Sequence, residues 1–91
     1  LDGTPDTYAS RVALAVALLG REQPREARRV LDGAVQDFPE RPQAYIQRAI
    51  ARFGLRDVDG ARADLKRALR INPRDPIPRK LLREIGSRLG D

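Results

Sequence analysis

Residues 60–73 read "GARADLKRALRINP", and residues 26–39, which lie 34 positions earlier, read "EARRVLDGAVQDFP". The two stretches share residues at five matching positions, and the same offset aligns three further identities upstream. The identical pairs are Ala15/Ala49, Ala17/Ala51, Gly20/Gly54, Ala27/Ala61, Arg28/Arg62, Leu31/Leu65, Ala34/Ala68 and Pro39/Pro73. Because repetition at a fixed period is typical of proteins built from stacked units, the chain is predicted to contain one structural unit twice.

Each unit is expected to hold two helices, with boundaries marked by proline and aspartate. Pro5 and Pro42 open the first helices, where the missing amide hydrogen costs nothing. Asp57 is a good N-cap for the helix that follows it, and Pro39 and Pro73 end the second helices. The predicted helices span residues 5–20, 24–37, 42–54 and 58–71.

A fifth helix is expected after Asp75, with Pro76 in its first turn. Its apolar face carries Leu81, Leu82, Ile85 and Leu89. The chain is therefore divided into a lead-in of residues 1–7, repeats of residues 8–41 and 42–75, and a C-terminal capping helix of residues 76–91.

The repeated pattern resembles the tetratricopeptide repeat (TPR) family, whose period is also 34 residues. The family's sequence of small, small, large and terminal proline residues is matched by Ala49, Ala61, Leu65, Ala68 and Pro73, and by their counterparts in the first repeat. The resemblance implies an all-α fold of antiparallel helix-turn-helix repeats that form a short right-handed solenoid of about five helices. It also implies a scaffold for protein–protein interaction.

The second repeat carries charge where the first is apolar. Leu14 and Val30 of the first repeat are replaced by Arg48 and Asp64 in the second. Because an unpaired buried guanidinium would cost several kcal/mol, the exchange predicts a structural ion pair between Arg48 and Asp64. The alternative is that both side chains reach solvent separately.

In the TPR arrangement, the first helices line a concave surface. Leu14, Ala15 and Leu18 are expected to pack within their helix pair, which leaves another apolar face for a partner. The predicted partner-binding residues are Val12, Val16, Leu19, Ile46, Gln47, Ile50 and Phe53. This face suits an apolar or amphipathic segment of another protein, and the alternatives are cover by the C-terminal helix or by a second copy in a homodimer.

Some members of the family hold the acidic C-terminal tail of heat-shock chaperones through Lys, Asn and Arg side chains. The corresponding positions here are Val12, Val16, Gln47, Ile77 and Leu81. Since none of them is cationic, the resemblance argues against an acidic tail as the ligand.

Composition excludes several kinds of chemistry. The 91 residues include no His and no Cys, so neither a Ser–His pair nor a thiolate metal site can form, and we expect no enzyme, cofactor or metal.

The apolar run from Val12 to Leu19 is far shorter than the roughly 20 residues that span a bilayer, and a soluble, cytoplasmic protein is favoured. A net charge of +5 leaves contact of the basic surface with RNA or another anionic partner as the weakest alternative.

Overall fold

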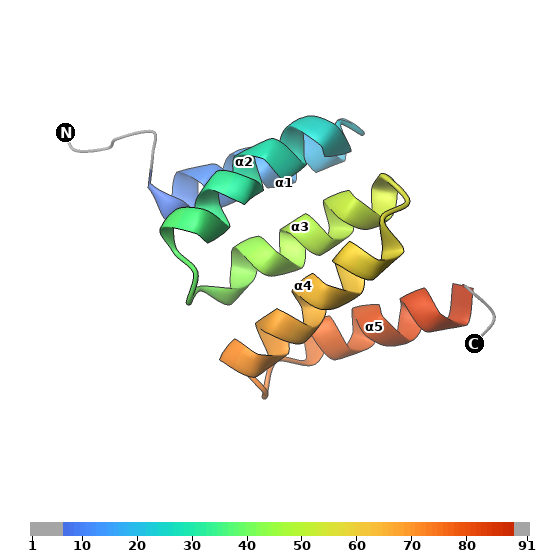
Figure 1. Ribbon diagram of the computed structural model, residues 1–91. Helices are drawn as coiled ribbons and strands as arrows, with labels where there is room; N and C mark the ends of the chain where they lie inside the picture. Colours follow the sequence, from blue (N-terminus) through green and yellow to red (C-terminus); the bar gives the residue numbers. More distant parts are fainter. Residues whose placement is uncertain (1–6, 89–91) are drawn as a thin grey trace.

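The computed structural model describes residues 7–88, and this part of the chain consists of helices and turns without a strand (Figure 1). Each helix packs against the next along the chain, and α1 also contacts α3. The predicted all-α fold is therefore confirmed. The helices are α1 (Tyr8–Gly20), α2 (Pro24–Asp37), α3 (Pro42–Gly54), α4 (Val58–Ile71) and α5 (Pro76–Arg88).

The helix starts follow the capping residues. The first helix begins at Tyr8, and Thr7 is its N-cap, which accepts the Ser10 amide at 3.2 Å. Pro5, the predicted first residue of this helix, lies outside the described residues. Asp57 accepts the amide of Gly60 at 2.9 Å and caps α4 as predicted. Ahead of α5, Asp75 accepts the amide of Ile77 at 3.0 Å. Leu89, which was assigned to the apolar face of this helix, also lies outside the described residues.

The turns inside the two helix pairs are built alike. Glu22 and Arg56, which lie 34 residues apart, have φ values of 58° and 68°. After each of them, the next amide donates to the carbonyl five residues earlier, at 2.9 Å for Gln23 and 2.8 Å for Asp57. Both turns therefore place a non-glycine residue in the left-handed region, at a cost of order 1–3 kcal/mol.

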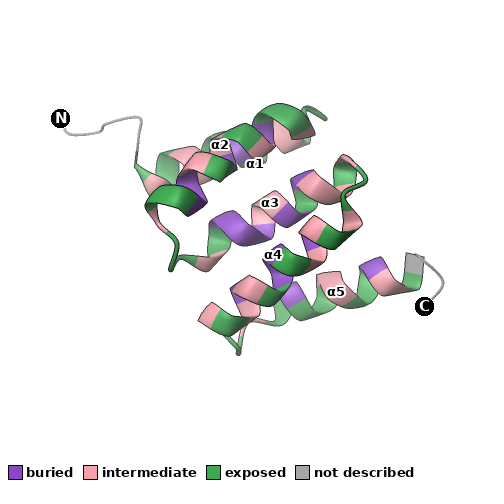
Figure 2. Ribbon diagram, in the orientation of Figure 1, coloured by how far each residue is buried: buried purple, intermediate pink, exposed green. Residues whose placement is uncertain are grey.

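Alanines at the helix crossings build the core. At these positions the short side chains let neighbouring helix backbones approach closely, and Figure 2 shows the buried residues on the sides where helices face one another. Leu31 and Leu65 are fully buried between them. The alanines exposed by 2% or less at the repeat positions are Ala15, Ala27, Ala34, Ala49, Ala61 and Ala68.

One expectation about the first helix pair is wrong. Leu14 is 51% exposed instead of packing inside the pair, although the side chain of Arg48, its counterpart in the second repeat, is only 15% exposed. Ala51 of α3 is fully buried, whereas its counterpart Ala17 is exposed. The reason is that α2 covers this side of α3, while no described helix lies in front of α1. We call this side, with Ser10, Leu14 and Ala17, the open edge of α1.

Candidate functional site

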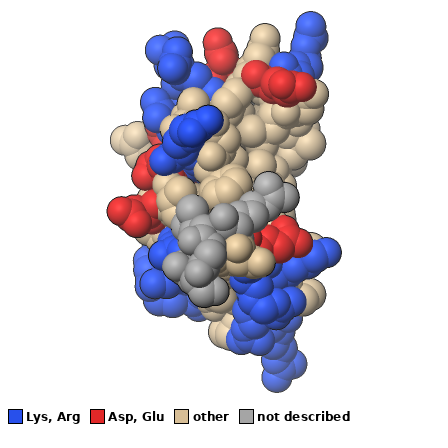
Figure 3. Space-filling view, turned by 90° about the vertical axis from the view of Figure 1, so that its right-hand side faces the viewer, with Lys and Arg blue, Asp and Glu red and all other residues tan. Residues whose placement is uncertain are grey.

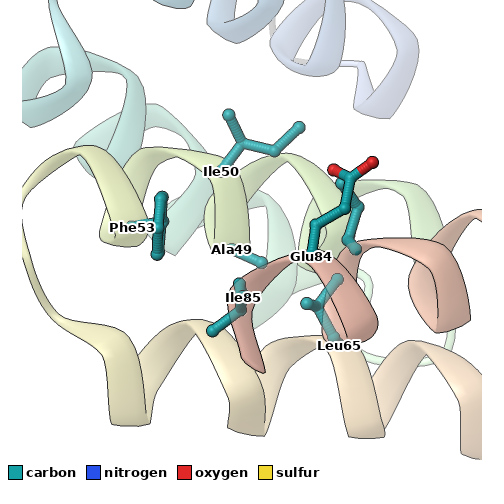
Figure 4. A pocket seen from close by; sticks show the side chains of 7 residues that line it. Ala49, Ile50, Phe53, Leu65, Glu84 and Ile85 are labelled. Carbon is teal, nitrogen blue, oxygen red and sulfur yellow. The ribbon is translucent and has the colours of Figure 1, made fainter. Parts of the chain in front are cut away.

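Ile50, on the middle of α3, lies between two cavities. The first, which we call the anchor cavity, has a volume of about 200 Å³ and lies between α3, α4 and α5 (Figure 4). It is lined by Ala49, Ile50, Phe53, Leu65, Leu81, Glu84 and Ile85. The second, the turn cavity, is lined by Leu19, Glu22, Pro24, Ile50 and Gly54.

These two cavities form one apolar surface with Ile50 at its centre. Ile50 is 40% exposed, and its side chain projects to the same side as the carboxylate of Glu84 (Figure 4). An apolar cavity of about 150 Å³ is enough to hold a benzene molecule, so the anchor cavity can accept one aliphatic or aromatic side chain. We call the surface formed by Leu19, Ile50, Phe53, Leu81 and Ile85 the concave strip.

The structure brings only part of the predicted partner-binding set to these cavities. Leu19, Ile50 and Phe53 line one or both of them. Val16 is 47% exposed but lines neither cavity. Val12 and Gln47 are half-buried and also lie outside both linings.

Ile46 is a correction to the predicted set. It is only 3% exposed, belongs to the larger core cluster and lines neither cavity, so it is not part of the concave strip. Tyr8 and Val12 of α1 pack against the same cluster, and the hydroxyl of Tyr8 accepts the amide of Ala44 at 2.8 Å. Val12 and Ile46 of the predicted partner-binding set are therefore used in the packing of α1 against the start of α3.

The predicted partner-binding set includes no residue of α5, although cover by the C-terminal helix was one of the alternatives for this face. Leu81 and Ile85 line the anchor cavity, so the last helix covers the strip beside Phe53 but leaves Ile50 exposed. Glu84 lines the same cavity. The spacing of residues 81, 84 and 85 places them on one helix face, a signal that could have predicted the role of Glu84.

A buried ionic network lies behind the strip. Arg48 donates to both carboxylate oxygens of Asp64, from Nε at 3.0 Å and from Nη2 at 2.8 Å. Asp64 is only 3% exposed and also accepts from Nη1 of Arg52 at 3.2 Å. The structure thus brings the predicted pair together and adds a second arginine, one helical turn further along α3, that sequence reasoning did not include.

The network also crosses from one repeat to the other. Nη1 of Arg48 donates to Asp32 of α2 at 3.1 Å, so a single guanidinium joins α2, α3 and α4. Burial opposes the charged form of Arg48, but the bonds and charges of Asp64 and Asp32 outweigh it and raise its pKa above the usual value. The two carboxylates therefore favour the charged form of Arg48.

Comparison with known proteins supports the same architecture. A family model described as "Tetratricopeptide repeat" matches residues 12–76, which is well over half of the chain. The chain belongs to the TPR family. No protein with a curated description matches it in sequence.

Two solved TPR structures are similar to this chain over nearly its whole length. The first TPR of Spaghetti (RPAP3), bound to the HSP90 peptide SRMEEVD, is 26% identical with a TM-score of 0.88, and the match covers 99% of this chain and 71% of that one. The first TPR domain of human RPAP3, solved by NMR, is 26% identical with a TM-score of 0.89, over 98% of this chain and 70% of that one. The fold of this TPR chain is therefore one that holds a peptide in a relative.

Charge is unevenly distributed over the TPR chain. Figure 3 shows Lys and Arg side chains grouped toward the upper and lower ends of one face, with Asp or Glu side chains and uncharged surface between them. Among residues 7–88 no three His, Cys, Asp or Glu side chains gather in a way that could hold a metal ion. Within the same residues no helix is both long and apolar enough to cross a membrane.

Proposed function

We propose that this TPR chain binds an apolar or amphipathic segment of another protein on the concave strip. The observation that carries the proposal is the position of Ile50, which is 40% exposed and lines both cavities. Burying a side chain of this kind stabilises a complex by roughly 1.5–3 kcal/mol, and the anchor cavity gives an incoming side chain a place to be buried. The peptide held by the similar TPR of RPAP3 supports this mode of binding.

The ligand is proposed to differ from the peptide of that relative. SRMEEVD carries two glutamates and ends in aspartate. On this chain, the positions that correspond to the carboxylate-binding residues of the family are Val12, Val16, Gln47, Ile77 and Leu81. Without a cation at these positions an acidic tail would lose its charge partners, so we propose that this chain does not bind one.

The proposed module consists of repeats 8–41 and 42–75, followed by a capping helix within residues 76–91. The helix ends at Gly20, Asp37, Gly54 and Ile71 support this division. We assign the chain no catalytic step, in keeping with a family of interaction modules.

A random peptide library displayed on phage tests the proposal directly. Peptides selected on the wild-type protein would be synthesised, and their dissociation constants measured by fluorescence anisotropy. Ile50→Glu places a charge at the centre of the strip and is expected to weaken binding at least tenfold, or about 1.4 kcal/mol. Leu14→Glu is the matched control, because it makes the same change at a similarly exposed residue on the open edge of α1. Equal loss in both variants, or no selected peptide, would contradict the proposal.

Self-association through the open edge of α1 is a second candidate. The exposure of Leu14 and Ala17 favours it, since the matching positions of α3 are covered by a helix. Light scattering on a size-exclusion column is expected to show a dimer that Leu14→Glu dissociates and Ile50→Glu leaves intact. A monomer at all concentrations would remove this candidate without affecting peptide binding.

A further inference from the structure

Each of the two cavities beside Ile50 has one charged lining residue, and both are glutamates. Glu84 lines the anchor cavity and Glu22 lines the turn cavity. The lining of both cavities is otherwise apolar, apart from backbone atoms. Because Ile50 borders both, a segment that crosses it passes between the two carboxylates.

Neither glutamate has an ion-pair partner among the described residues, and both are exposed. The arginines next to them in sequence, Arg21 and Arg83, line neither cavity. In a chain with a net charge of +5, the charges that border the apolar strip are thus opposite in sign to those of the molecule as a whole.

A comparison of the two turns shows that the acidic residue is not required by the backbone. Glu22 and Arg56 adopt the same left-handed conformation at the same position of the two repeats. Arg56 lines neither cavity, whereas Glu22 does. The turn therefore accepts either charge, and the negative one stands where a ligand would lie.

We infer that the segment bound on the concave strip is cationic, with an apolar anchor residue in the anchor cavity and Lys or Arg side chains next to it. One basic side chain would face Glu84 and a second, on the other side of Ile50, would face Glu22. Exposed charges at the border of an interface act mainly on specificity and association rate, so they select a basic segment over a neutral or acidic one. This inference rests on the proposed function and specifies its ligand.

The peptides selected on the wild-type protein provide the first test. We expect them to be enriched in Lys or Arg within one helical turn of an apolar residue, and depleted in Asp and Glu. Replacing those Lys or Arg residues with Glu in a synthetic peptide is expected to weaken binding roughly threefold to tenfold at low salt, with a smaller difference at high salt. A selected pool without basic enrichment, or with acidic enrichment, would overturn the inference.

Charge reversal on the protein provides the second test. The double variant Glu22→Lys/Glu84→Lys is expected to bind the Glu version of the peptide better than the Lys version. The double variant Glu26→Lys/Asp59→Lys is the matched control, because it changes the net charge equally at exposed residues that line neither cavity and form no ion pair with a described side chain. If both double variants change peptide preference to the same extent, overall charge is responsible and the inference is wrong.

The two proposals fail differently. If Ile50→Glu abolishes binding but the charge-reversed protein keeps its preference, the strip binds peptides and the inferred charge of the ligand is wrong. If Ile50→Glu has no effect on any selected peptide, the strip is not the binding site and the proposed function itself fails.

Discussion

The two helix pairs have helices of equal length and the same left-handed turn, but different side chains close them. The first repeat places Leu14, Leu18 and Val30 at the positions where the second has Arg48, Arg52 and Asp64. The charged set lies in the interior between α2 and α4, while Leu14 is 51% exposed at the open edge of α1. Position in the array, rather than residue type, therefore decides how far the side chain is covered at the position shared by Leu14 and Arg48.

The buried charges are tolerated because the surrounding helices balance them. Asp64 accepts hydrogen bonds from two arginines, and Asp32 of the other repeat adds a second carboxylate to Arg48. Two cations and two anions thus meet at the junction of the repeats, and a third carboxylate, that of Asp57, lies 3.8 Å from Nε of Arg52. Such a network is specific in geometry, but its net contribution to stability is smaller than the cost of removing one member.

Removing the central carboxylate is expected to have the largest effect. Asp64→Ala leaves Arg48 and Arg52 facing each other without their shared acceptor and should reduce the free energy of unfolding by about 3–5 kcal/mol. Urea denaturation followed by circular dichroism measures this loss.

The triple variant Arg48→Leu/Arg52→Leu/Asp64→Val is the control for that prediction. It places in the second repeat the apolar residues that the first repeat has at the same three positions. Its stability is expected to equal or exceed that of the wild type, since apolar replacements of buried ion pairs are often neutral or stabilising. An Asp64→Ala protein as stable as the wild type would show that the network contributes nothing.

A pair of alanine substitutions contrasts the covered and open helix faces. Ala51→Leu adds bulk to a fully buried site between α2 and α3 and should cost about 1–3 kcal/mol. Ala17→Leu makes the same change at the open edge of α1, where the effect should stay within about 0.5 kcal/mol. Thermal unfolding of both variants measures the difference, and similar losses would mean that α1 is covered in solution.

The two left-handed turn residues are expected to behave alike. Glycine adopts positive φ without steric cost, so Glu22→Gly and Arg56→Gly should each raise the free energy of unfolding by about 0.5–1 kcal/mol. Only Glu22→Gly should also weaken the binding of a basic peptide. Destabilisation by either substitution, measured in the same urea titrations, would contradict the backbone equivalence of the turns.

The exposed end of the ionic network should have the smallest effect. The side chain of Asp32 is 48% exposed, compared with 4% for that of Asp64. Asp32→Ala is therefore expected to cost less than about 1 kcal/mol, and the loss should shrink further as salt is added. A loss as large as that of Asp64→Ala would show that contact between the repeats depends on Asp32.

The sequence by itself determined the repeat, the helix boundaries within it and the residues at the helix crossings. Ala27, Leu31 and their counterparts 34 residues later could be predicted from the sequence, because spacing along a helix sets which side chains share a face. The pairing of Arg48 with Asp64 could also be predicted from the sequence, because both residues belong to one repeat.

Only the tertiary structure decided which apolar faces remain open. The sequence pattern treats Ile46 and Ile50 alike, yet α1 covers the first and leaves the second 40% exposed. Glu84 and Ile85 join the site only because α5 packs against α4 beside the strip. Periodicity specifies the direction in which a side chain points from its helix, whereas burial depends on which distant helix stands opposite, and that is settled by packing across the whole array.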